Sequence, residues 1–110
     1  MKPESMDNVF QALASATRRR MIDIVIGKPG CSVAHVAKHF DVSRIAVMKH
    51  LSVLEKADLI LSEKQGRTRR LYFNAVPIQM IHERWTTEYS AMWAGRLTDF
   101  KYLVEKKQKD

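Results

Sequence analysis

The feature that most constrains the fold is a pair of short helical patterns separated by only three residues, Asp-Val-Ser. Before this link, Val33 and Val36 share one helical face in the segment "VAHVAKHF". After it, Ser43 is a good N-cap for a helix that runs to about Ala57. Two helices joined by so short a turn, here at about 33–57, are typical of a helix-turn-helix.

The second of these helices carries apolar residues on two faces. Its inward stripe consists of Val47, Leu51 and Leu54. Ile45 and Met48 lie off that stripe, among polar residues. Either the helix is buried all round, or its second face meets something other than water.

The segment after the helix changes to the alternating period of β-strands. Two antiparallel strands are expected at about 59–74, with a tight turn at Gly66. The predicted hairpin is basic and has Glu63 as its only acid between 62 and 73. Its basic residues are Lys64, Arg67, Arg69 and Arg70. These side chains can reach phosphates or a minor groove, although an ordinary solvated hairpin is the alternative.

A helix-turn-helix followed by such a wing is a DNA-binding layout, in which the second helix enters the major groove. Arginine pairs with guanine and apolar side chains pack on thymine methyl groups, whereas Lys49, His50 and Ser52 suit phosphates. The residues of this helix expected to contact DNA are Ser43, Arg44, Ile45, Met48, Lys49, His50 and Ser52. The alternative is a solvated face with two apolar residues by chance.

The C-terminal segment returns to a helical period, and one helix is expected at about 77–107. A helix of about 28 residues is about 42 Å long, more than a small domain covers. Its apolar stripe therefore predicts a partner helix, most simply from a second copy. The expected interface residues are Ile81, Trp85, Tyr89, Trp93, Leu97 and Phe100. The aromatic residues among them could instead wall a ligand pocket.

The charge balance predicts an anionic partner. The formal net charge of this 110-residue chain is +7, which favours nucleic acid or a membrane surface. The length suits a single domain over 1–110. No apolar run approaches the length of a membrane span, and the first residues lack the apolar core of a signal peptide. We therefore expect a cytoplasmic protein with no membrane partner.

Metal binding and catalysis have weaker support. Cys31, His35 and His39 are spaced by four residues and are weak metal candidates, because no fourth ligand lies nearby in sequence. A lone Cys-His pair could also supply a thiolate nucleophile. The chain has no Gly-rich phosphate loop and no His-Glu-x-x-His motif. We expect no metal, no cofactor and no enzymatic activity.

Three segments together resemble the ArsR-type winged-helix regulators. They are "LASATRRRMIDIV", "SVAHVAKHFDVSRIAVMKHLSVLEKADLI" and "EKQGRTRRLYF", and the likeness covers roughly 9–104. The family's recognition helix has the form Ser-x-x-Ala-Val-x-x-His-Leu-x-x-Leu-x-x-Ala-x-Leu. This chain fills it with Ser43, Ala46, Val47, His50, Leu51, Leu54, Ala57 and Leu59.

The resemblance implies a mainly α fold with a small β-hairpin, namely a winged helix-turn-helix with long N- and C-terminal dimerisation helices. It implies a homodimeric bacterial transcriptional regulator, usually a repressor, that binds a palindromic operator in double-stranded DNA. It adds Val9, Phe10 and Leu13 to the expected dimer interface. In many members a metal or another inducer releases the DNA, but the family's cysteine-pair site would need a second cysteine. Metal sensing therefore does not carry over, and the inducer is unknown.

Two other functions stay open from the residues alone. The same fold could serve as a protein- or ligand-binding module that uses the aromatic C-terminal helix, and a small enzyme could use Cys31. Salt-sensitive binding to random DNA separates the regulator from both.

Overall fold

The computed structural model describes residues 1–86 and 90–109. They form two compact units, Met1–Ile78 and Gln79–Asp110. The expectations of one domain over 1–110 and of one helix over about 77–107 both include residues 87–89, which lie outside the described residues.

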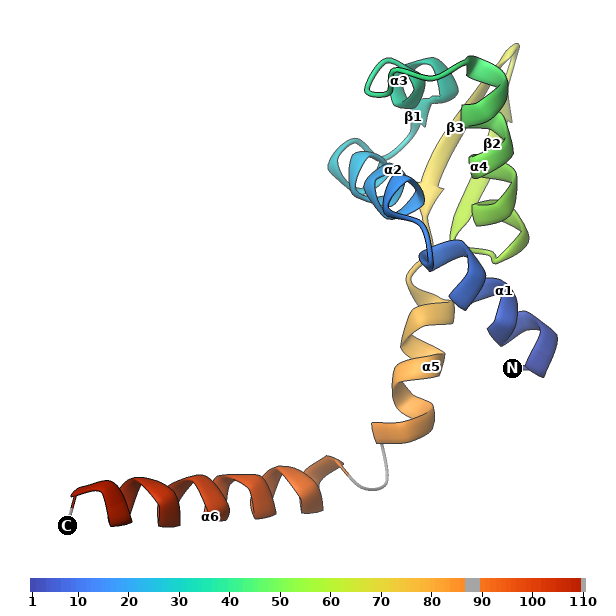
Figure 1. Ribbon diagram of the computed structural model, residues 1–110. Helices are drawn as coiled ribbons and strands as arrows, with labels where there is room; N and C mark the ends of the chain where they lie inside the picture. Colours follow the sequence, from blue (N-terminus) through green and yellow to red (C-terminus); the bar gives the residue numbers. More distant parts are fainter. Residues whose placement is uncertain (87–89, 110) are drawn as a thin grey trace. The chain divides into compact units, whose positions relative to one another are not determined.

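The first unit begins with two helices that contact each other and the helix-turn-helix (Figure 1). Helix α1 spans Pro3–Leu13, and its proline lies in the first turn, where a missing backbone N–H costs nothing. Helix α2 spans Ala16–Gly27. The Ser15 hydroxyl caps it by accepting a hydrogen bond from the backbone N–H of Arg18 at 3.3 Å.

The helix-turn-helix is present as predicted. Helix α3 spans Val33–Ala37 and helix α4 spans Arg44–Lys56. Ser32 and Ser43 cap them, because each hydroxyl accepts a hydrogen bond at 3.1 Å from the backbone N–H three residues later. Beyond Ala57, Asp58 has a φ of 59°, and its left-handed conformation ends α4.

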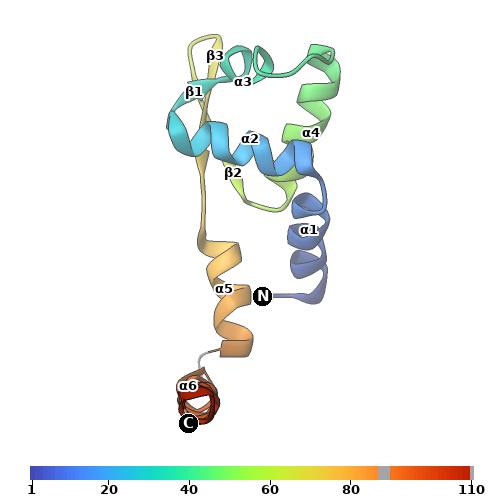
Figure 2. The ribbon, with the colours of Figure 1, turned by 60° about the vertical axis from the view of Figure 1, so that its left-hand side comes forward.

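A small antiparallel sheet lies beside these helices (Figure 2). Strand β1 spans Cys31–Ser32, β2 spans Ile60–Gln65 and β3 spans Thr68–Phe73, in the order β1-β3-β2. Strands β2 and β3 form the predicted hairpin. Strand β1 was not predicted, because two residues are too few to show an alternating period.

The core of the first unit lies between the sheet and helices α1 to α4. Its largest fully buried side chains are Met21, Leu54, Leu59, Ile60, Leu71, Val9, Val25, Val36, Val47 and Cys31. The prediction that Val9 belongs to a dimer interface is therefore wrong, because its side chain is 1% exposed and packs inside its own unit. Phe10, the next residue of α1, is exposed.

The remaining helices are α5, Val76–Thr86, and α6, Ser90–Lys109. No helix among the described residues is long and apolar enough to cross a membrane. The architecture as a whole is mainly helical with a small sheet, which confirms the predicted winged helix-turn-helix.

Candidate nucleic-acid interface

Helix α4 has one buried and one exposed face. Val47, Leu51 and Leu54 are buried, as the spacing predicted. Ile45 lies on the opposite side with 69% of its surface exposed, and Arg44, Lys49 and Ser52 are also exposed. A single exposed apolar side chain is normal on a protein surface, so the case for a partner depends on the basic side chains that lie beside Ile45.

His50 does not lie on the exposed face. At about 100° per residue, it is about 140° around the helix from Ile45. Its ring is half-buried, and its Nδ1 atom is 3.2 Å from Nη1 of Arg18 on α2. Nδ1 of His50 is therefore directed toward its own domain, which weighs against the expected phosphate contact.

The wing ends in a two-residue turn, Gly66-Arg67. Gly66 has a φ of 62°, a conformation that favours glycine, and it lets β2 and β3 pair up to Gln65 and Thr68. Arg67 therefore sits at the tip of the hairpin, where its side chain is exposed, as is that of Lys64 on β2.

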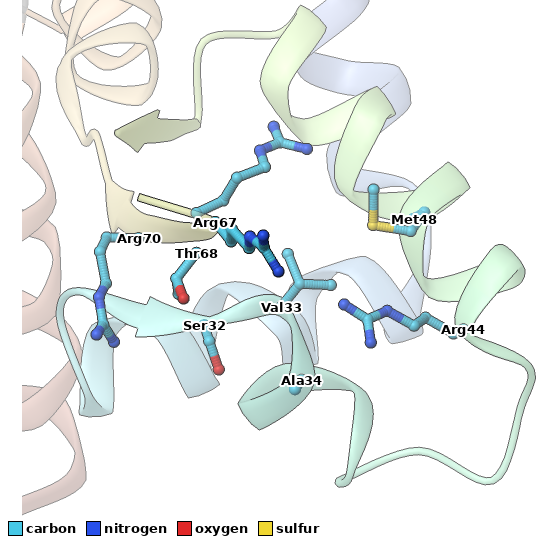
Figure 3. A pocket seen from close by; sticks show the side chains of 9 residues that line it. Ser32, Val33, Ala34, Arg44, Met48, Arg67, Thr68 and Arg70 are labelled. Carbon is cyan, nitrogen blue, oxygen red and sulfur yellow. The ribbon is translucent and has the colours of Figure 1, made fainter. Parts of the chain in front are cut away.

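A hollow of about 420 Å³ separates the wing from the beginning of α4. Its lining consists of Ser32, Val33, Ala34, Arg44, Met48, Arg67, Thr68, Arg69 and Arg70. Figure 3 shows Arg44 from α4 and Arg67 from the turn pointing into the same space. No Asp or Glu of the described residues lines this arginine hollow, so it is a concentrated positive field that favours an anion.

Two of its arginines are held by their own domain. The guanidinium of Arg69 donates to the carboxylate of Glu55 on α4, and to the hydroxyl oxygen of Ser62 at 2.9 Å. Nη1 of Arg70 lies 3.4 Å from the carbonyl oxygen of Gly30, on the β1 side of the sheet. These contacts favour a role in fixing the wing, and direct contact of either arginine with DNA stays a prediction.

The candidate metal ligands do not form a site. Cys31 is buried on β1, and burial raises the pKa of its thiol. The rings of His35 and His39 meet edge to face with centroids 5.0 Å apart. Desolvation, followed by the charges of Lys38, Lys28 and His39, lowers the pKa of His35. Among the described residues, no three potential ligands come together.

Sequence reasoning missed five residues of this surface, namely Ser32, Val33, Ala34, Thr68 and Glu55. Ser32 and Ala34 line the arginine hollow, and Glu55 holds the wing. Nothing in the spacing of Ser32 indicates that the wing lies next to it. Glu55 has a readable signal, since it is an isolated acid on a helix followed by a basic hairpin.

An exposed recognition helix beside a basic wing defines the class of winged helix-turn-helix DNA-binding proteins. A family model described as a helix-turn-helix domain matches residues 13–63. The HTH-type transcriptional regulator Rv2034 of Mycobacterium tuberculosis is 34% identical over 96% of this chain and 94% of its own length. The chain belongs to the ArsR family of DNA-binding transcriptional regulators, which are not enzymes.

Other relatives agree with this assignment. The transcriptional repressor SdpR of Bacillus subtilis is 30% identical over 67% of this chain and 81% of its own length. The crystal structure of an ArsR family transcriptional regulator is 34% identical and has a TM-score of 0.71, covering 86% of this chain and 95% of that chain. An ArsR-like regulator from Rhodococcus is 29% identical with a TM-score of 0.69, covering 94% and 93%.

Proposed function

We propose that the protein is a bacterial, cytoplasmic, homodimeric repressor that binds a palindromic operator. In this proposal α4 of each copy enters a major groove and the wing, residues 62–73, follows the adjacent backbone. The observation that carries the proposal is the arginine hollow beside the exposed beginning of α4. A helix in one groove and a wing in the next must straddle the phosphate strand between them, and the positive charge of the hollow supports this arrangement.

The side chains around the hollow fall into two groups by their chemistry. Arg44, Ile45 and Met48 are near the beginning of α4, where base edges are within reach, so we assign them to base reading. Lys49, Ser52, Lys64 and Arg67 are exposed and suit phosphates. Ser43 caps α4 through its oxygen, and its hydroxyl proton can still be donated to a phosphate.

The proposed dimer rests on an apolar stripe along α6. Trp93, Leu97, Phe100 and Val104 follow the helical repeat on one side, and Phe100 is 67% exposed. Such a stripe is explained if a second copy covers it. Phe10 and Leu13 on α1, and Ile81 and Trp85 on α5, complete the proposed interface among the described residues. Tyr89, also predicted there, lies outside the described residues.

Selecting bound fragments from random duplex DNA tests the proposal directly. The expected product is an inverted repeat with half-sites about 34–36 Å apart, one helical turn. Arg44→Ala should lose discrimination at one base pair in each half-site, at about 1–3 kcal/mol. Lys56→Ala, at the far end of α4, is the matched control and should keep that discrimination. Bound fragments that share no sequence would contradict base reading by α4.

A second candidate follows from the same exposed stripe on α6. The chain could be an interaction module that uses this stripe to bind a different protein or a small ligand. In that case, duplex DNA binding would be weak and insensitive to salt. Retention on random DNA at two salt concentrations separates the candidates, because a regulator that contacts phosphates elutes earlier at the higher concentration.

A further inference from the structure

The side chain of Arg18 on α2 reaches back to the end of α1. Its Nε donates to the carbonyl oxygen of Ala12 at 2.9 Å, and its Nη2 donates to that of Gln11 at 2.8 Å. Carbonyl groups in the last turn of a helix have no partner within the helix, and a cation there also opposes the negative end of the helix dipole. Arg18 therefore caps α1.

The same guanidinium also contacts the recognition helix. Its Nη1 lies 3.2 Å from Nδ1 of His50 on α4. An arginine has only donors, so Nδ1 must accept this hydrogen bond and the ring proton must sit on Nε2. One planar group thereby connects α1, α2 and α4, on the side of α4 that faces away from the exposed Ile45.

We propose that Arg18 is a positioning residue for sequence reading, which holds α4 at a fixed orientation to α1 through His50. This inference rests on the proposed DNA-reading role of α4. Hydrogen bonds between a side chain and a base edge weaken steeply when they are misaligned, whereas phosphate contacts tolerate a rotation of the helix. Removing the hydrogen bond between Arg18 and His50, the Arg18–His50 link, should therefore reduce sequence discrimination more than general affinity for DNA.

A neighbouring arginine supplies a matched control. Nη1 of Arg19 donates to the carbonyl oxygen of Leu13 at 2.6 Å, so Arg19 also caps α1. It makes no contact with α4 among the described hydrogen bonds. If Arg18 acted only as a cap, the two arginines would have similar effects on DNA reading.

The experiment compares Arg18→Met, His50→Leu and Arg19→Met in the full chain, on a selected duplex and on random duplex. His50→Leu leaves the capping of α1 intact, so it tests the link even if Arg18→Met folds poorly. We expect Arg18→Met and His50→Leu each to weaken selected-duplex binding about tenfold. Random-duplex affinity and the salt slope should not change, and Arg19→Met should keep full discrimination. The Arg18→Met/His50→Leu double variant should lose no more than either single variant.

Three results would overturn the proposal. Equal losses on both duplexes with a shallower salt slope would make these residues phosphate contacts. A loss of discrimination in Arg19→Met would show that the capping of α1 is the cause. Additive losses in the double variant would show that Arg18 and His50 do not act together.

If the wild-type chain binds no duplex, the proposed function fails. Amide hydrogen exchange then tests the Arg18–His50 link without DNA. Arg18→Met and His50→Leu should speed exchange in α4, whereas Arg19→Met should not. Equal exchange in all three variants would then refute the link.

Discussion

Arg67 and Arg69 lie two residues apart on the wing, yet their replacement by alanine should have opposite consequences. Arg67 is exposed at the hairpin tip and lines the arginine hollow. Arg69 is held by Glu55 and Ser62, and its side chain is 37% exposed. We expect Arg67→Ala to change DNA binding but not stability, and Arg69→Ala to change stability but not the salt dependence of binding.

The size of each effect follows from these contacts. A lysine or arginine on one phosphate adds about 0.9 to the slope of log affinity against log salt. Releasing 0.9 of an ion at about 0.1 M salt is worth about 1.2 kcal/mol, or about eightfold in Kd. The Arg69–Glu55 ion pair is partly exposed to solvent, so we expect Arg69→Ala to lower the free energy of unfolding by only about 0.5–1 kcal/mol.

The assay measures Kd for one duplex between about 0.05 and 0.3 M salt, together with urea unfolding of each variant. Ser62→Ala is the control, because it removes one partner of Arg69 without changing any charge. The reasoning is refuted if Arg69→Ala flattens the salt dependence as much as Arg67→Ala does. That outcome would mean that Arg69 leaves Glu55 and binds a phosphate in the complex.

Three further predictions concern other parts of the surface. Phe100→Glu should give a monomer or an aggregate in sedimentation, since a charge would be buried without a partner. The control Tyr102→Glu, on the opposite side of α6, should not. A Phe100→Glu dimer at micromolar concentration would show that the interface lies elsewhere. Ile45→Ala should shift the preferred operator base while changing the unfolding free energy by less than about 0.5 kcal/mol, because the side chain is exposed; an unchanged preference would count against base contact. Cys31 should react with iodoacetamide more slowly than a free thiol at pH 8, since burial raises its pKa and leaves less thiolate; a rate equal to that of a free thiol would contradict its burial.

Local signals made the helix-turn-helix and the wing predictable. Ser43 acts on a backbone N–H only three residues away, and Gly66 acts within its own turn. The buried stripe of α4 follows from spacing within one helix. Each of these signals is complete within a few residues of sequence, so the sequence alone is enough to place the elements.

Contacts between elements were not predictable in the same way. Arg69 meets Glu55 across 14 positions, and His50 meets Arg18 across 32. Arginine and histidine both suit phosphates. Only the packing of helices and strands shows that Arg69 and His50 have hydrogen-bond partners inside the domain. Val9 shows the same limit, because its helical spacing fits a core and an interface equally well.

The two-residue strand β1 has a consequence for the order in which the chain folds. Cys31 and Ser32 pair with Leu71 and Arg70, about 40 positions later, and β3 is the central strand of the sheet. During synthesis on the ribosome, helices α1 to α4 emerge before this strand exists. Closing so long a loop carries an entropic cost that only the completed sheet repays. The nascent helix α4 therefore leaves the ribosome before the wing that accompanies it can form, and the proposed DNA-binding surface is complete only after β3 has been synthesised and paired.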